Sequence, residues 1–206
     1  MKNFVFLVFA AGVIPIDAAT IALSPASMAV SPGHVISLDL VISNLGSILV
    51  GDFDLDIGFD PSVLTLNSAT PGSHLGDIAS GQALDFSLGE TGPGVVNIAV
   101  VSTLSFPALA AIQTPPFSLA TLSFTVGPIG GATTVEIASL NALGDSTGTA
   151  ISIDAVGSAT LTANAAIPEP GGIGPIGLGV VLLAVQRAIR RPSRWLPRRR
   201  SPRPRP

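Results

Sequence analysis

The chain has 206 residues, of which 47% are apolar and 11% are charged, with no Cys and no Tyr. This length suits one domain with extensions, and the lack of Cys excludes disulfides, thiolate nucleophiles and Cys-based zinc or iron–sulfur sites. Lys2 and nine Arg from Arg187 onward are the basic residues, whereas all 13 acidic residues lie between Asn3 and Gln186. The formal net charge of −3 therefore averages an acidic body and basic ends, which indicates membrane topology or an interaction tail before any active site.

Residues 1–19 have the pattern of an export signal. Lys2 is followed by an apolar run from Phe4 to Ile14 and then by small residues up to Ala19. A positive start, an apolar run of this length and small residues at the cleavage site are typical of a signal peptide. We predict a signal peptide over 1–19, cleaved after Ala18 or Ala19. The alternative, a buried first element of the domain, fits the charged start less well.

Residues 20–163 follow a hydrophobic period of two rather than 3.6, which favours strands over helices. Gly and Pro interrupt nearly every gap between the apolar runs, as expected for turns. Such spacing predicts an all-β domain, an antiparallel two-sheet sandwich of about nine strands, with no amphipathic helix of useful length. The expected strands are Val35–Ser43, Asp52–Asp60, Val63–Leu66, Ala83–Leu88, Val95–Val101, Phe117–Val126, Thr133–Leu140, Ala150–Ile153 and Ser158–Ala163.

An acidic row occupies one face of an expected strand. Asp52, Asp54 and Asp56 alternate with apolar residues, so that neighbouring carboxylates lie ~6.8 Å apart along the strand. That spacing is too wide for one cation to join all three without ligands from loops, and the later Gly and Glu of an EF-hand are missing. We expect a solvated face and no cofactor, with calcium binding as the alternative.

Two further patterns in the sequence match residue types used in catalysis or metal binding. Gly144-Asp-Ser-Thr-Gly148 matches the G-x-S-x-G pattern of serine hydrolases, but both His34 and His74 precede Ser146 and a strand is expected after it. We therefore expect a tight turn between strands and no enzyme. The two histidines stand alone, so surface positions are expected and a zinc site is not.

The body resembles a cohesin domain. The resemblance is carried by Ser31-Pro-Gly33, by the run from Val50 to Leu64 with its Phe-Asp-Pro-x-x-Leu ending, and by Leu143–Ile153 followed by Gly157–Leu161. It implies a jelly-roll sandwich related to carbohydrate-binding modules over 20–163, and a dockerin as partner in cellulosomal members. No residue here identifies a dockerin-binding face. A polysaccharide partner remains open, although a body without Tyr or Trp disfavours an aromatic sugar-binding platform.

The C-terminal region has three parts. Residues 164–172 form a linker that contains Pro168, Glu169 and Pro170; residues 173–186 are a short apolar segment; and residues 187–206 are a tail rich in Arg and Pro. The 17 uncharged positions from Pro170 to Gln186 would span ~26 Å as a helix, just short of the hydrocarbon core. We predict a short transmembrane helix over 173–186. Arg187, Arg190 and Arg191 would then stop transfer and stay cytoplasmic.

This arrangement resembles the PEP-CTERM sorting signal. The resemblance covers about the last 40 residues and rests on Pro168-Glu169-Pro170, the apolar segment and the Arg cluster standing together at the C-terminus. It implies recognition by an exosortase, a membrane transpeptidase of Gram-negative bacteria that also make exopolysaccharide. The chain departs from the pattern by continuing past its first arginines to Pro206.

The Arg-rich tail could in principle bind nucleic acid, with Trp195 stacking on a base. Its place directly after an apolar segment favours contact with anionic lipid headgroups instead. The sequence as a whole predicts an exported, non-enzymatic protein of the cell surface or extracellular matrix, with an adhesive or structural domain. The alternative is a binding module for a polysaccharide or a dockerin-like protein. Without residues 1–19 and the tail, the body keeps eleven acidic residues and no Lys or Arg, which disfavours nucleic acid as its partner.

Overall fold

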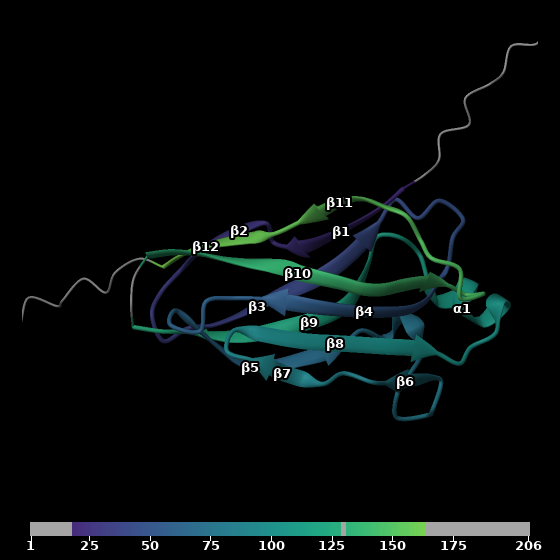
Figure 1. Ribbon diagram of the computed structural model, residues 1–206, viewed down its shortest axis with the longest axis horizontal. Helices are drawn as coiled ribbons and strands as arrows, with labels where there is room; N and C mark the ends of the chain where they lie inside the picture. The colour runs from purple at the N-terminus through teal and green to yellow at the C-terminus, as the bar shows by residue number, and fades with distance from the viewer. Residues whose placement is uncertain (1–17, 129–130, 164–206) are drawn as a thin grey trace, which may run out of the picture. The chain divides into compact units, whose positions relative to one another are not determined.

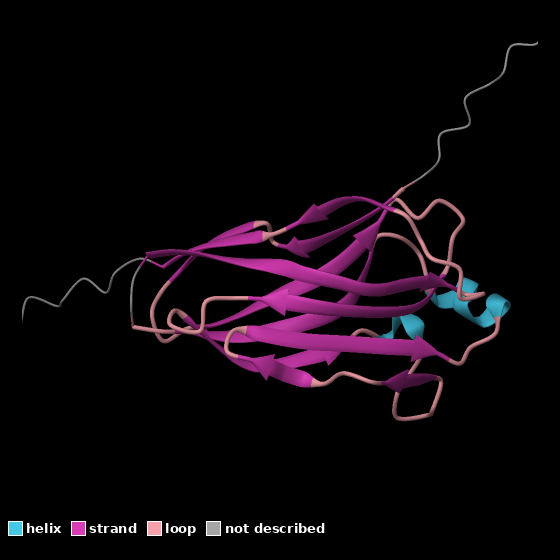
Figure 2. Cartoon of the chain, viewed as in Figure 1, coloured by secondary structure: helices cyan, strands magenta, loops and turns pink. Residues whose placement is uncertain are grey.

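The computed structural model describes residues 18–128 and 131–163, which form a sandwich of two β-sheets (Figures 1 and 2). The linker, the apolar segment, the Arg tail and nearly all of the expected signal peptide lie outside the described residues. Ala19, at the expected end of that signal, is the first residue of the first strand and is buried. No helix among the described residues has the length and apolarity needed to cross a membrane.

One sheet has five strands in the order β11-β1-β3-β9-β5. Its central strands β3 and β9 pair antiparallel, with Leu38 opposite Leu122. The strands are β1 (Ala19–Ser24), β3 (Val35–Ser43), β5 (Leu64–Pro71), β9 (Phe117–Val126) and β11 (Ile153–Gly157).

The other sheet follows the order β2-β12-β10-β4-β8-β6, and β7 also pairs with β8. The long strand β10 changes partner part-way: its first residues pair with β12 and its later ones with β4. The strands are β2 (Ser27–Val30), β4 (Val50–Gly58), β6 (Ala83–Asp85), β7 (Gly89–Gly92), β8 (Val95–Ser102), β10 (Gly131–Asp145) and β12 (Ala159–Ala163).

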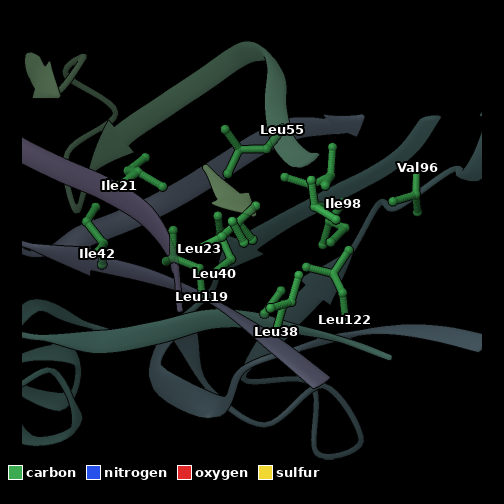
Figure 3. Packing of buried hydrophobic residues seen from close by; sticks show 14 of the residues in the cluster. Ile21, Leu23, Leu38, Leu40, Ile42, Leu55, Val96, Ile98, Leu119 and Leu122 are labelled. Carbon is green, nitrogen blue, oxygen red and sulfur yellow. The ribbon is translucent and has the colours of Figure 1, made fainter. Parts of the chain in front are cut away.

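The core between the sheets follows from the period-two alternation. Alternate residues of β3 and β4 are buried, and these are all apolar: Ile36, Leu38, Leu40 and Ile42 in β3, and Phe53, Leu55 and Ile57 in β4. Aliphatic residues from both sheets meet in this layer (Figure 3). Phe59 and Phe124 add an edge-to-face aromatic pair with ring centroids 5.1 Å apart. Within the described ranges 18–128 and 131–163, this cluster extends from Ala19 to Ala163 and takes residues from both sheets.

The predicted sandwich is confirmed, and its strand pattern is corrected. The described residues form twelve strands rather than about nine, because β1, β2 and β7 were not expected. Both sheets are mixed rather than antiparallel: β1 runs parallel to β11, and β2 runs parallel to β12. The strand expected at Ala150–Ile153 begins only at Ile153. The N-terminal stretch thus splits between the two sheets, and each half pairs with one of the last two strands.

Two short helices were also missed. They are η1 (Ser73–Leu75), a 3-10 turn after β5, and α1 (Phe106–Ile112), which joins β8 to β9 across the gap between the sheets. Pro107 sits in the first turn of α1, where its missing N–H costs no hydrogen bond. The helix buries Leu109.

The described core predicts that two leucines contribute very differently to the free energy of unfolding. Leu55 on β4 is fully buried, so Leu55→Ala should lower the free energy of unfolding by about 2–5 kcal/mol. Leu88 is exposed, and Leu88→Ala should change it by no more than about 0.5 kcal/mol. Urea unfolding followed by far-UV circular dichroism measures both, since the domain has no Trp. Equal losses in the two variants would contradict the described core.

Candidate functional site

The outer face of the second sheet carries the acidic row. Since Phe53, Leu55 and Ile57 of β4 point into the core, the alternate residues Asp52, Asp54 and Asp56 point outward, and each is half-buried. The neighbouring strands β8 and β10 flank β4 on both sides, so the carboxylates lie along the middle of the sheet. The expected solvated row is therefore only partly open to water.

A single buried amide joins two of these carboxylates. Asn97 of β8 lies opposite Asp56 in the antiparallel pair and is 4% exposed. Its Nδ2 donates to Asp54 Oδ1 at 2.6 Å and to Asp56 Oδ1 at 2.9 Å. Hydrogen bonds to carboxylates are stronger than those between neutral groups. Asn97 therefore holds the two carboxylates in a fixed arrangement without neutralising either.

A second amide reaches the same carboxylates from β10. Asn141 Nδ2 lies 3.2 Å from both Asp54 Oδ1 and Asp56 Oδ2, and Ser139 Oγ donates to Asn141 Oδ1 at 2.7 Å. The pairing of β10 with β4 shifts register near Ile137 and again near Leu140. Such bulges turn side chains away from strict alternation, and they accompany the placement of Ser139 and Asn141 over β4.

An apolar group lies beside this polar cluster, where the edge strand bulges. Between β6 and β7 the chain leaves the regular ladder, and Phe86 and Leu88 are 58% and 75% exposed. Side chains repair the interrupted ladder: Ser87 Oγ accepts from Ala99 N at 3.1 Å, and Asn97 Oδ1 accepts from Leu88 N at 3.1 Å. The bulge is thus held in place while its large side chains face solvent.

These two groups form one surface, which we call the binding face. It comprises the polar cluster and the apolar group, namely Asp54, Asp56, Asn97, Asn141, Leu84, Phe86, Leu88 and Val101. Asn97 belongs to both, since its amide nitrogen binds the carboxylates and its oxygen fixes the bulge. Exposed apolar side chains beside ordered polar groups are typical of protein interaction sites. The two carboxylates suit a partner that brings cationic groups or hydrogen-bond donors.

Asp52 has different surroundings, near the turn after β10. Partial burial raises the pKa of its carboxyl above the ordinary value and the nearby Asp145 carboxylate adds to this, while a hydrogen bond from the Gly144 backbone opposes it. Gly144 leaves room for this carboxyl group, since a Cβ there would meet the Asp52 side chain and make it move aside. Because the folded state binds this proton more tightly, the associated stability is lost as the pH rises through the raised pKa.

The G-x-S-x-G segment is a turn, as expected. Asp145 Oδ1 accepts hydrogen bonds from Thr147 Oγ1 and Thr147 N, both at 2.7 Å, and from Thr149 N at 2.9 Å. These bonds, led by the Thr147 hydroxyl, lower the pKa of Asp145. The chain then forms a bridge between Gly144 and Ala150 rather than a helix, so Ser146 does not stand on a nucleophile elbow.

The expectation of two surface histidines is half right. His34 is exposed, but His74 stacks on Phe117 with ring centroids 4.9 Å apart, and its buried Nδ1 has no hydrogen-bond partner. Across the described ranges 18–128 and 131–163, no group of three or more His, Cys, Asp or Glu side chains is arranged to hold a metal ion. Asp54 and Asp56 instead bind the two amides. The sorting-motif residues Pro168, Glu169 and Pro170, and Arg187, Arg190 and Arg191, lie outside the described residues.

The sequence patterns did not predict the residues that complete the site. Asn97 stands inside the apolar run Val95–Val101, and a polar residue in such a run signals a buried hydrogen-bonded group. That signal was available. Nothing local in the sequence pairs it with Asp54 and Asp56, which lie about 40 residues earlier, or with the bulge at Phe86–Leu88.

A search against protein-family models matches residues 21–162 to the cohesin domain. The chain belongs to the cohesin domain family. A search of curated proteins finds no match.

Solved cohesin structures have the same fold. The solution structure of CaCohA2 from Clostridium acetobutylicum has a TM-score of 0.57 and 21% identity, over 74% of this chain and 94% of that one. The seventh ScaB type I cohesin from Pseudobacteroides cellulosolvens has a TM-score of 0.58 and 13% identity, over 73% and 95%. The cohesin in the Coh-OlpA–Doc918 complex from Clostridium thermocellum has a TM-score of 0.55 and 13% identity, over 71% and 99%.

The hydrogen bonds of Asn97 predict that its replacement makes this cohesin domain less stable. Asn97→Ala leaves Leu88 N without its acceptor and removes two donors from the carboxylates, which should lower the free energy of unfolding by about 1–3 kcal/mol. Asn141→Ala is the matched control, because Asn141 is exposed and water replaces its bonds. Chemical unfolding of both variants measures the difference. A loss in Asn97→Ala no larger than in Asn141→Ala would contradict the joining role of Asn97.

Proposed function

We propose that the cohesin domain is a non-enzymatic protein-binding module, and that a dockerin-like partner docks on the binding face. The observation that carries this proposal is the Asn97 junction, which holds an exposed apolar bulge beside two fixed carboxylates. The family supports the choice of partner. Cohesins of the same fold have been solved in complex with dockerins, among them Coh-OlpA with Doc918 and the sixth cohesin of Acetivibrio cellulolyticus scaffoldin B with the Cel5 dockerin.

The chemistry of the face supports a protein rather than a polysaccharide. Sugar rings stack on rows of aromatic side chains, and Phe86 is the one aromatic residue of the binding face. Aliphatic side chains such as Leu84, Leu88 and Val101 instead match the apolar side chains of a protein. The carboxylates of Asp54 and Asp56 have no basic residue of the domain to pair with, because the sequence has no Lys or Arg between Asn3 and Gln186. They remain available to cationic groups of a partner.

We further propose that the domain acts outside the cytoplasm, at the cell surface or in the extracellular matrix. Residues 1–19 supply the export signal, and residues 173–186 the membrane segment. Pro168-Glu169-Pro170 supplies the motif for an exosortase of a Gram-negative cell, and Arg187, Arg190 and Arg191 stop transfer beside anionic lipids. A folded domain without Cys needs no oxidising compartment to stabilise it. Surface display would present the binding face to partners outside the cell.

The binding face predicts the effect of one substitution. Phe86→Asp places a charge on the apolar bulge beside Asp54 and Asp56, and it should weaken dockerin binding at least tenfold. Binding is measured by biolayer interferometry against immobilised dockerin modules from the source organism. Val35→Asp, which also places a charge at an exposed apolar residue but on the opposite sheet, is the control. If no dockerin module binds, or if both variants bind as tightly as the wild type, the proposed partner or face is wrong.

Sorting predicts a processed C-terminus. In cells that carry an exosortase, mass spectrometry of the mature protein should find a chain that begins at Ala19 or Thr20 and ends near Pro168, without Arg187–Pro206. Glu169→Ala should leave the tail attached and the protein in the membrane fraction. Full-length protein in the soluble cytoplasmic fraction would contradict export.

A further inference from the structure

The first strand of the domain lies between two neighbours from its first residues onward. Ala19 begins β1 and is 1% exposed. Its backbone N–H donates to Ser152 O at 3.1 Å, and the residue pairs with Ile153 of β11. Thr20, the next residue, pairs with Ser43 of β3 on the other side. Figure 1 shows β1 beside β11. The N-terminal end of β1 is therefore an ordered part of the sheet.

This order distinguishes between the two cleavage sites expected from the sequence. Cleavage after Ala18 leaves β1 whole, with Ala19, Ile21 and Leu23 buried in the core. Cleavage after Ala19 removes one of these buried side chains and the hydrogen bond to Ser152. The fold therefore favours a mature chain that begins at Ala19.

Hydrolysis of the Ala18–Ala19 bond adds a cation to an acidic domain. A signal peptidase adds water across this bond, so that Ala18 leaves with a new carboxylate and Ala19 keeps the amine. An α-amine has an ordinary pKa of about 7.7–8.0, and most of it is therefore protonated at neutral pH. Apart from His34 and His74, residues 19–163 have no side chain that can carry a positive charge. The terminal ammonium group is thus the main cationic group available to the mature domain.

A carboxylate stands beside this position in the sheet. The pairing of β1 with β11 shifts register directly after Ala19: Ala19 is opposite Ile153, but Thr20 is opposite Ala155. The shift leaves Asp154 in a bulge next to the residue that faces Ala19, and Asp154 is exposed. Bulges re-aim the side chain of the extra residue. The bulge therefore brings one carboxylate to the start of β1.

No other charged side chain of β1, β3 or β11 lies near Ala19. β1 carries none, and Asp154 is the one charged residue of β11. On β3 the one charged residue is Asp39, which pairs with Ser24 at the far end of β1. Five residues of extended strand separate Ser24 from Ala19 by about 17 Å. Asp154 is thus the carboxylate that these strands offer to a cation at Ala19.

We propose that the mature domain begins at Ala19 and that its terminal ammonium group forms an ion pair with Asp154. The ammonium keeps its bond to Ser152 O as a charged donor, and the Asp154 carboxylate accepts from a second of its N–H groups. The pair joins the first strand of the domain to β11, near the other end of its sequence. Removal of the signal peptide therefore adds a contact to the sheet. The proposed export signal enters this inference only as the means by which the new N-terminus is made.

The charge of the amine can be read directly, because Lys2 is the only lysine of the chain and leaves with the signal peptide. An acetylating N-hydroxysuccinimide ester then has the α-amine as the single amine of the mature protein, and it attacks only the neutral form. The full chain is exported, purified in detergent and weighed intact, and it should begin at Ala19. At pH 7, Asp154→Asn should be acetylated about threefold faster than the wild type, since a nearby carboxylate favours the charged amine. Asp39→Asn, at the far end of β1, is the matched control and should react at the wild-type rate.

The pH dependence separates an ion pair from a change in access. Above about pH 10 the amine is neutral in every variant, so the acetylation rates should converge. A rate for Asp154→Asn that is raised by the same factor at every pH overturns the ion pair, and so do equal rates at pH 7. A mature chain that begins at Thr20, or at any residue other than Ala19, overturns the assignment of the N-terminus.

Failure of export gives a separate result. A chain that starts with Met directly before Ala19 and runs to Pro206 loses this Met in the cytoplasm, because aminopeptidases remove Met before a small residue. It has the same N-terminus without a signal peptide. If the signal peptide stays attached in exporting cells, the proposed export is wrong, while acetylation of this second chain still measures the ion pair. Equal rates at pH 7 for it and for its Asp154→Asn variant overturn the pair.

Discussion

The placement of β4 between β8 and β10 is the constraint on which both the core and the binding face depend. On one side of β4, Phe53, Leu55 and Ile57 fill the space between the sheets; on the other, Asp54 and Asp56 meet the amides of the two neighbouring strands. A slip of one residue would turn the aspartates into the core and the apolar side chains to water. Burial of the apolar set therefore fixes the register, and the register brings the carboxylates to Asn97 and Asn141.

Because the domain has no basic residues, other groups must donate hydrogen bonds to its carboxylates. The domain has no Lys or Arg that could lie beside its acidic residues. Amide, hydroxyl and backbone donors take their place: Asn97 at Asp54 and Asp56, and the Thr147 hydroxyl and backbone at Asp145. Such donors order a carboxylate and leave its charge in place. The binding face consequently keeps a negative electrostatic potential. This potential attracts cationic groups within the Debye length, about 8 Å at physiological salt.

The local sequence pattern predicts much of the sandwich, but it does not predict which strands pair when they are far apart in the sequence. The bounds of β3 and β9 agree with expectation because continuous apolar or alternating runs end at clear turns. β1 and β2 were missed although β1 alternates, since they are short and complete their sheets through parallel pairing with β11 and β12 near the other end of the chain. The acidic row was visible on β4. Its amide partners and the bulge with Phe86 were not, because three strands distant in sequence assemble them.

The strand that carries the carboxylates also fixes helix α1. The side chain of Gln113, directly after the helix, bonds to both backbone groups of Val50 at the start of β4. Along the rest of its length β4 is held between β8 and β10. Because the backbone of β4 is held at its start and on both sides, Asp54 and Asp56 keep their positions beside the exposed apolar side chains without help from a partner. A surface that is ordered in advance loses little conformational entropy when a partner binds.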